Sequence, residues 1–137
     1  MFTTHESSFV VFPEHANHHS PLIFGGKFAA ELDLAAANCV RKFLFDSTEV
    51  SHAVTHRMEI EFKKPCYVGD LLCLHAEIVE AKDKHVVVNV IAQRARKNKD
   101  WDIIAIAKFV FITVEDLSLS VGSKPDFLPY KSHGMLW

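Results

Sequence analysis

The spacing of the apolar residues changes once along the chain, near Asp46, and this change constrains the fold more than any other feature. Between Gly25 and Leu44, apolar residues recur every three or four positions, which predicts an amphipathic α-helix of about five turns. After its first two residues this segment is rich in alanine and contains no glycine or proline, so its intrinsic propensity also favours a helix. The face that we expect to contact the core carries Phe28, Leu32, Ala35, Cys39 and Phe43.

Beyond Asp46 the period of the pattern becomes two, which is typical of a half-buried β-strand. Polar and apolar residues alternate through the segment 57–63. Its polar positions would face solvent. We expect the opposite face of this strand to be formed by Met58, Ile60 and Phe62.

Three longer strands follow a break at Pro65 and a turn at Gly69-Asp70. Only short polar turns separate them, which predicts an antiparallel meander of Leu71–Ala81, His85–Arg96 and Trp101–Thr113. Several stretches of these strands are apolar on both faces. The helix can cover one face of the sheet. The other face needs a cover that this chain does not supply, which suggests a partner subunit.

The two ends of the chain carry less pattern. Ser8 to Phe12 is short and apolar and predicts an edge strand that Pro13 ends. The segment 14–23 is expected to be a loop, and the segment 114–137 an irregular C-terminal tail. Together the elements predict one α+β domain over residues 1–137, in which an antiparallel sheet wraps a long central helix.

Composition excludes several classes of protein. Lys and Arg (15) nearly balance Asp and Glu (17) without a basic stripe, so we do not expect a nucleic-acid partner. The longest apolar stretch, 103–112, is too short to span a bilayer, and the first residues lack the pattern of a signal peptide. Three cysteines without a CxxC pair fit a reducing compartment. We therefore expect a soluble cytoplasmic protein that does not act at a membrane.

Asp33 is the residue in the predicted helix that most suggests chemistry. It lies away from the charged arc of the helix, and a carboxylate among small side chains sits where a ligand or another backbone can come close. Such a carboxylate can act as a base or a nucleophile if a partner orients it. The alternative is a boundary aspartate that caps a loop or pairs with a lysine. On a helical wheel, the residues next to Asp33 are Ala29, Ala30, Ala36, Ala37 and Val40.

Gly25 and Gly26 open the same helix. Two glycines let a substrate approach the backbone, and the free N–H groups of a helix N-terminus can hold a developing oxyanion. Asp33 lies seven residues after Gly26, about 10 Å along the helix axis, so one helix cannot bring both to the same carbonyl group. A second subunit packed antiparallel can.

The loop before the helix contains Glu14, His15, Asn17, His18 and His19. Such a cluster invites a metal-site interpretation, but no further ligand pair with metal-like spacing follows, so we expect no metal. The alternative is a polar loop whose Asn17 or histidine side chains position a substrate or a water molecule. Phosphate-binding glycine loops and the GxSxG nucleophile motif are missing, and the cysteines read as packing residues.

Two segments of the chain form motifs. The first is Pro-Leu-Ile-Phe-Gly-Gly from Pro21, with an acidic residue, Asp33, seven positions after the second glycine. The second is Phe-Lys-Lys-Pro-Cys-Tyr-Val-Gly-Asp, from Phe62 to Asp70, which has the pattern F-x-x-P-x-x-x-G-D. Both resemble signature segments of the hotdog-fold acyl-CoA thioesterases. The resemblance implies a hotdog fold and a homodimer whose sheets join, with active sites across the interface. It leaves open whether dimers assemble further into tetramers or hexamers.

The resemblance also implies roles for individual residues. Asp33 would act as general base or nucleophile on the thioester carbonyl, and the amide of Gly26, with that of Gly25, would bind the oxyanion. Asn17 would take the place of the asparagine that such enzymes use in the preceding loop. The family usually has Asn-x-x-Gly there, whereas this chain has Asn17-His-His-Ser and one extra residue, so His18 or His19 is the alternative. The residues expected to contact substrate are Phe24, Gly25, His18 and His19.

The implied activity is hydrolysis of an acyl-CoA, or of an acyl carrier protein thioester, with coenzyme A as part of the substrate and no other cofactor. A different class remains open, a non-catalytic hotdog module that binds a small ligand or builds an assembly. A hotdog dehydratase, which pairs a histidine with a helix carboxylate, would use His19 and Asp33. The spacing from Gly26 to Asp33 favours the thioesterase.

Overall fold

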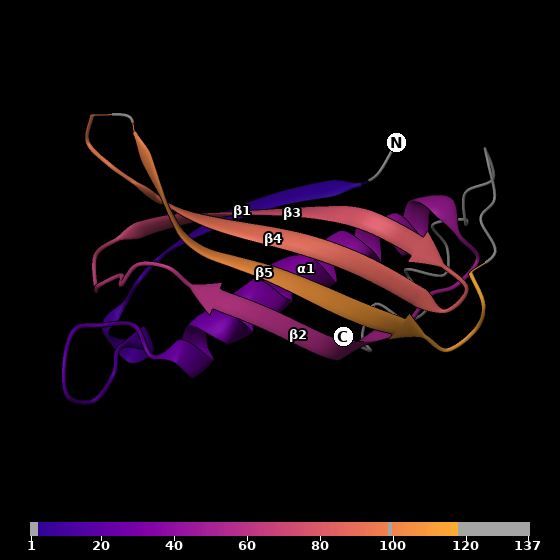
Figure 1. Ribbon diagram of the computed structural model, residues 1–137, viewed down its shortest axis with the longest axis horizontal. Helices are drawn as coiled ribbons and strands as arrows, with labels where there is room; N and C mark the ends of the chain where they lie inside the picture. The colour runs from indigo at the N-terminus through magenta and orange to yellow at the C-terminus, as the bar shows by residue number, and fades with distance from the viewer. Residues whose placement is uncertain (1–2, 99, 118–137) are drawn as a thin grey trace, which may run out of the picture.

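The computed structural model describes residues 3–98 and 100–117, and the predicted C-terminal tail lies outside the described residues from position 118 onward. A long helix lies against one face of a curved five-stranded sheet (Figure 1). The elements, in chain order, are β1 (Thr4–Val10), a 3-10 turn (Pro13–His15), α1 (Gly25–Ser47), β2 (Ala53–Phe62), β3 (Leu71–Lys82), β4 (His85–Ala95) and β5 (Trp101–Thr113).

The strand order is β1-β3-β4-β5-β2, and every described pairing is antiparallel. Strands β3, β4 and β5 form the predicted meander. Strand β2 pairs with β5 instead of its sequence neighbour β3, so β1 and β2 are the two edges of the sheet. The predicted α+β architecture, one helix wrapped by an antiparallel sheet, is confirmed. Within the described residues, no helix is both long enough and apolar enough to cross a bilayer.

The helix buries the face that its periodicity predicts. All five expected core residues, from Phe28 to Phe43, are buried against the inner face of the sheet. The helix ends at Ser47, one turn beyond the predicted end at Leu44, because Thr48 completes it. The Thr48 hydroxyl donates to the Leu44 carbonyl (3.0 Å) and accepts from the Val50 amide (3.0 Å). These bonds give partners to backbone polar groups that would otherwise be buried without a hydrogen bond at the helix end.

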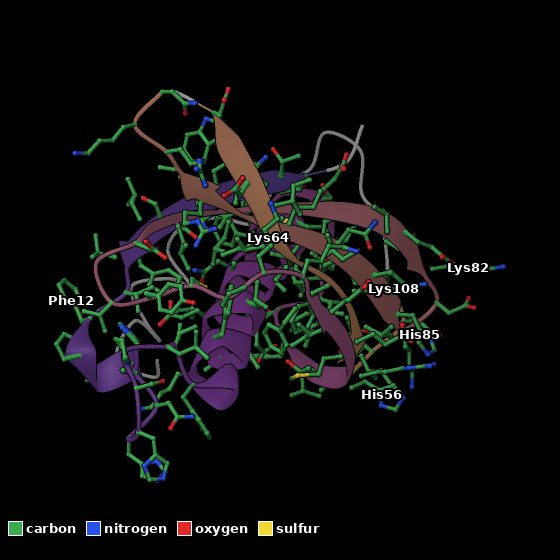
Figure 2. The ribbon with its side chains drawn as sticks, turned by 60° about the vertical axis from the view of Figure 1, so that its left-hand side comes forward. Phe12, His56, Lys64, Lys82, His85 and Lys108 are labelled. Carbon is green, nitrogen blue, oxygen red and sulfur yellow. The ribbon has the colours of Figure 1, made fainter. Side chains whose placement is uncertain are left out.

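The first strand differs from its prediction. It spans Thr4–Val10 rather than Ser8–Phe12, because its ladder with β3 runs from Val10 opposite Leu71 to Thr4 opposite Glu77. Pairing at an edge does not require an apolar pattern, so the polar residues before Ser8 gave no signal. Phe12, the predicted last residue of the strand, lies outside it and is half exposed beside the 3-10 turn (Figure 2).

The second strand is interrupted by a bulge between Thr55 and Arg57, so that Thr55 and Met58 both face the helix side of the sheet. The expected apolar face is only partly covered. Met58 is 44% and Phe62 48% exposed, although the Phe62 ring packs 5.4 Å from that of Phe28. These side chains are exposed because β2 is an edge strand of the described sheet and α1 does not extend over its outer side.

Candidate active site

The two segments that carry the family resemblance contact each other in the fold. The backbone amide of Ile23 donates to the carbonyl of Cys66 (3.0 Å), and the amide of Val68 donates to the carbonyl of Pro21 (2.9 Å). The start of α1, the end of β2 and the start of β3 meet at one end of the molecule (Figure 1). The segment 62–70 therefore fixes the loop that leads into the helix and the position of its first turn.

The first turn of α1 offers free backbone donors. Phe24 is the N-cap residue, its side chain makes no capping hydrogen bond, and its carbonyl accepts the amide of Phe28 at 3.0 Å. The helix itself does not use the amides of Gly25, Gly26 and Lys27, and the helix dipole places partial positive charge there. This end of the helix can stabilise a negative oxygen.

The ring of Phe24 lies over Gly26. A Cβ atom built on Gly26 would come within 2.9 Å of Phe24 Cε2, closer than real Cβ contacts allow, whereas a Cβ on Gly25 would meet nothing within 4 Å. The ring itself is 51% exposed, so it can move. Glycine at position 26 therefore gives the Phe24 ring room against the first turn.

A pocket of about 210 Å³ opens beside this turn. Its walls are mostly apolar and include the buried thiol residue Cys66, and no acidic residue lines it. The pocket is large enough for a small apolar group but not for a whole coenzyme. The residues lining it are Leu22, Ile23, Gly25, Phe28, Phe62, Lys63, Lys64, Pro65 and Cys66.

Asp33 lies two turns further along α1 and is half-buried. Its carboxylate oxygen Oδ1 accepts a hydrogen bond of 2.8 Å from the Thr55 hydroxyl, which comes from the start of β2. The bond favours one orientation of the side chain, and the residue that orients it is a threonine. The alternative was a pairing of Asp33 with a lysine, but the partner of Oδ1 in the structure is the Thr55 hydroxyl. Within the chain, Asp33 and the first turn of the helix remain about 10 Å apart along the axis.

The loop residues are placed differently from one another. Asn17 is half-buried, its side-chain Oδ1 accepts the amide of His19 (3.1 Å), and its own amide donates to the carbonyl of Leu22 (2.7 Å). His18 and His19 are exposed, with ring centroids 3.7 Å apart. The side-chain oxygen of Asn17 is thus engaged in shaping its own loop.

Two other interpretations of the loop can be compared with this geometry. The dehydratase reading requires His19 beside Asp33, but the structure places the His19 ring against His18 and the Asp33 carboxylate against Thr55. For a metal site, three or more suitable side chains must converge. Over residues 3–98 and 100–117, no group of three His, Cys, Asp or Glu side chains does so.

An ion-pair network supports the segment under the helix start. Arg94 donates to the carbonyl of Pro65 (2.9 Å), to Asp70 (3.3 Å) and to Asp102 (3.0 Å). Arg96 also donates to Asp102, at 2.7 Å. Hydrogen bonds from Arg96 and Arg94 lower the pKa of Asp102 to about 2. The network ties strands β4 and β5 to the loop that carries the pocket wall.

The thiols are not poised for nucleophilic attack. Burial raises the pKa of Cys66, in the pocket wall, to about 11, and it does the same for Cys39 in the helix. Burial also raises the pKa of the partly exposed Cys73. A thiol with such a pKa is almost entirely protonated near neutral pH, so these cysteines act as packing residues, as expected.

A larger hollow of about 510 Å³ lies over strands β2, β5 and β4. Glu59, Glu61, Asn89 and Lys108 line it together with isoleucine side chains. It is not near the glycine turn, and Asp33 contacts the opposite side of the sheet through Thr55. Size alone therefore does not identify the site.

Sequence reasoning missed Thr55. Its segment was read for alternation beginning at Arg57, and the bulge that follows Thr55 breaks the alternation on which that reading depends. A signal was present in the sequence, since a threonine in an apolar context before an alternating strand is a candidate donor. The sequence alone could not identify Asp33 as its partner, because the two residues meet only through the position of β2 at the far edge of the sheet.

The fold and this arrangement define a hotdog protein with a half-buried carboxylate on its central helix and free amides at the start of that helix. The sequence matches the thioesterase superfamily over residues 7–98, about two thirds of the chain, and the chain belongs to this superfamily. The expectations of a hotdog thioesterase and of a thioester hydrolase are confirmed at this level. No curated protein sequence matches the chain.

Solved structures share the fold over most of the chain. An acyl-CoA hydrolase from Staphylococcus aureus, in complex with butyryl coenzyme A, coenzyme A and coenzyme A disulfide, is 21% identical, with a TM-score of 0.75, covering 97% of this chain and 82% of its own. A hexameric thioesterase from Yersinia pestis is 20% identical, with a TM-score of 0.72, covering 89% and 97%. A hypothetical thioesterase from Streptococcus pneumoniae with coenzyme A is 17% identical, with a TM-score of 0.67, covering 85% and 82%.

Structures of three alanine variants of the Staphylococcus aureus enzyme have also been solved. They replace an asparagine, a threonine and an aspartate, respectively. At identities near 20%, likeness to these structures establishes the shared fold.

Proposed function

We propose that the protein hydrolyses acyl-CoA thioesters with Asp33 as general base or nucleophile. The observation that carries this proposal is the hydrogen bond from Thr55, which holds a half-buried carboxylate in one orientation on the central helix. A structural aspartate at a solvated helix boundary would not need such a partner. The pocket beside Gly25 supplies apolar walls for part of the substrate.

The active unit is a homodimer, which can assemble further into a tetramer or hexamer. The surface beside Asp33 supports this proposal, because it is apolar and no part of the chain that the structure describes covers it. Leu34, the next residue of the helix, is 56% exposed, and Met58 and Phe62 on the neighbouring edge strand are nearly half exposed. A second copy with its helix antiparallel would cover this surface and bring its own glycine turn toward Asp33.

In the proposed reaction, Asp33 takes a proton from water while the water oxygen bonds to the thioester carbonyl carbon. The resulting oxyanion accepts a hydrogen bond from the amide of Gly26 of the partner subunit, a contribution typically worth about 2.7–4 kcal/mol. Collapse of the intermediate breaks the C–S bond, and the departing thiolate recovers the proton from Asp33. The alternative order, attack by Asp33 itself followed by hydrolysis of the anhydride, uses the same groups.

The relatives give further support for this assignment. The three residue types replaced in the Staphylococcus aureus variants are an asparagine, a threonine and an aspartate. This chain offers residues of the same three types in its candidate site, namely Asn17, Thr55 and Asp33. We propose that Asn17, or else His18 or His19, contacts the substrate from the loop, together with Phe24. Coenzyme A enters as part of the substrate, and no further cofactor is needed.

A non-catalytic module that binds a small ligand is the second candidate. One observation favours it: the Asn17 side-chain oxygen is committed to the amide of His19 and is not free to orient a substrate. A pocket without this polar group could bind an acyl thioester and not turn it over.

The decisive experiment measures thiol release from a panel of acyl-CoA substrates by wild type, Asp33→Asn and Asp33→Ala. Asp46→Asn is the matched control, since Asp46 is an exposed carboxylate on the same helix. We expect both Asp33 variants to keep the wild-type melting temperature and lose nearly all turnover, while the control keeps it. Wild-type rates in either Asp33 variant would refute the mechanism. Ligand binding by a wild type that hydrolyses nothing would favour the module.

A further inference from the structure

The pocket beside the glycine turn has a buried floor and an open mouth. It lies where the start of α1 meets the end of β2 (Figure 1), and Gly25 is part of its wall. Phe28 and Cys66, which are 2% and 1% exposed, form the floor, whereas Phe62 is 48% exposed and forms the mouth. The pocket therefore leads from the first turn of the helix toward the core.

We propose, on the basis of the hydrolase function proposed above, that this pocket is the acyl subsite and that its floor limits the acyl group to roughly six to eight carbons. The volume of the pocket gives this length. An apolar cavity of about 150 Å³ holds benzene, which has six carbons. The pocket is somewhat larger, at about 210 Å³, so a chain that starts at the helix N-terminus fills it within the stated length.

The polarity of the wall determines which end of the substrate enters. The carbonyl of Pro65 already accepts a hydrogen bond from Arg94 (2.9 Å), and the carbonyl of Cys66 accepts one from the amide of Ile23 (3.0 Å). The pantetheine arm of coenzyme A carries amide groups, which would lose hydrogen bonds to water in such a pocket. An acyl chain has no such groups to desolvate. The acyl end of the substrate is therefore the end that fits.

Two lysines contribute apolar surface to the wall. The ammonium group of Lys63 lies 3.2 Å from the carboxylate of Glu61, and that of Lys64 lies 3.6 Å from the carboxylate of Asp102. Both carboxylates belong to residues outside the pocket lining. A lysine whose charged end is held elsewhere covers apolar groups with its methylene stem. The wall of the pocket thus stays apolar although two cations border it.

The floor at Cys66 stops a longer chain. Burial raises the pKa of this thiol to about 11, so it stays protonated and packs as a small apolar group. Asp70 and Arg94 lie close enough for their charges to act on the thiol, and they form an ion pair of 3.3 Å outside the pocket lining. A chain that passed Cys66 would have to separate this pair. Cys66 is therefore the residue that sets the length limit.

A series of straight-chain substrates from acetyl-CoA to dodecanoyl-CoA tests the limit. Each methylene that enters the pocket should raise kcat/KM roughly fourfold, because apolar surface leaves water. The increase should stop at about six to eight carbons, where the floor is reached. A maximum at acetyl-CoA, or a rise that continues to dodecanoyl-CoA, would overturn the proposal.

Substitution of the floor residue tests its role. Cys66→Leu fills the floor and should move the preferred substrate toward shorter chains, whereas Cys66→Ala deepens the pocket and should move it toward longer ones. Cys39→Ala is the matched control, since Cys39 is equally buried but does not line the pocket. It should keep the wild-type profile. If Cys66→Leu does not fold, Cys66→Ala decides alone. A wild-type profile in folded Cys66→Ala, or the same shift in Cys39→Ala, would refute the assignment.

Binding measurements separate the subsite from the reaction. Calorimetry of acyl-CoA binding to Asp33→Asn requires no turnover, and the coenzyme is common to all ligands, so differences in affinity report the acyl group. The affinity should show the same length limit. Binding with this limit by a protein whose wild type hydrolyses nothing would refute the proposed function and support the subsite. Hydrolysis without any dependence on chain length would refute the subsite alone.

Discussion

The hydroxyl of Thr55 donates a 2.8 Å hydrogen bond to the carboxylate of Asp33, which joins the edge strand β2 to the middle of α1. Replacing Thr55 with valine keeps the shape of the side chain and removes the donor. We expect kcat to fall roughly tenfold to a hundredfold, because the carboxylate is no longer held in one orientation, with little change in KM. Thr55→Ser keeps the hydroxyl and should retain most activity. Steady-state kinetics on one acyl-CoA checks this, and a fully active valine variant would contradict it.

The two glycines at the start of α1 should respond differently to the same substitution. Gly26→Ala forces the Phe24 ring to move, because the new Cβ would lie 2.9 Å from it, whereas Gly25→Ala meets open space. We expect Gly26→Ala to reduce kcat strongly and Gly25→Ala to have a much smaller effect. Both should change the free energy of unfolding by less than about 1 kcal/mol, since alanine is favoured over glycine in a helix. Equal kinetic effects would show that the ring position does not matter.

The Asp102 network should make stability depend on acid pH. Its arginine partners lower the pKa of Asp102 from 3.8 to about 2, so the folded state favours the ionised carboxylate. This stabilisation is complete above about pH 4 and is lost as the pH falls toward 2. Asp102→Asn should therefore melt at a lower temperature than wild type at pH 6, and the difference should shrink as the pH approaches 2. A constant difference across this range would contradict the assignment.

The cysteines should react in a fixed order with iodoacetamide. Burial raises the pKa of Cys39 and Cys66 to about 11, and both side chains are covered in the folded protein. At pH 8 we expect Cys73 to be alkylated first, since it is partly exposed, and the other two only after unfolding. Mass spectrometry of the modified peptides, with denatured protein as control, measures this. Rapid labelling of Cys66 in the native state would mean that its pocket opens.

Much of the fold was predictable because the helix and the central strands each carry a strong period. The helix residues between Phe28 and Phe43 pack as their spacing indicates, and the meander of β3, β4 and β5 follows from its short turns. The edges were less predictable. The polar half of β1 is held by backbone pairing alone, and the partial exposure of Met58 results from the position of β2 in the sheet.

The candidate site was predictable only in part for the same reason. Asp33 stands out because a charged residue interrupts an apolar arc within one helix, which is a local pattern. Its partner Thr55 is 22 positions away and is brought to it by long-range topology. The contact between the loop before α1 and the segment 62–70 is also long-range, and no periodicity encodes it.

The bulge in β2 adds one residue to the strand at His56. Removing that single residue would turn the bulge into regular pairing and leave Thr55 on the helix side, because Thr55 and Arg57 already lie opposite consecutive residues of β5. Straightening the strand with His56 in place would instead turn Thr55 to the solvent side, since each step along a strand reverses the direction of its side chains. A chain of this superfamily that lacks the bulge should therefore be one residue shorter at this point if its strand keeps a side chain facing the helix carboxylate.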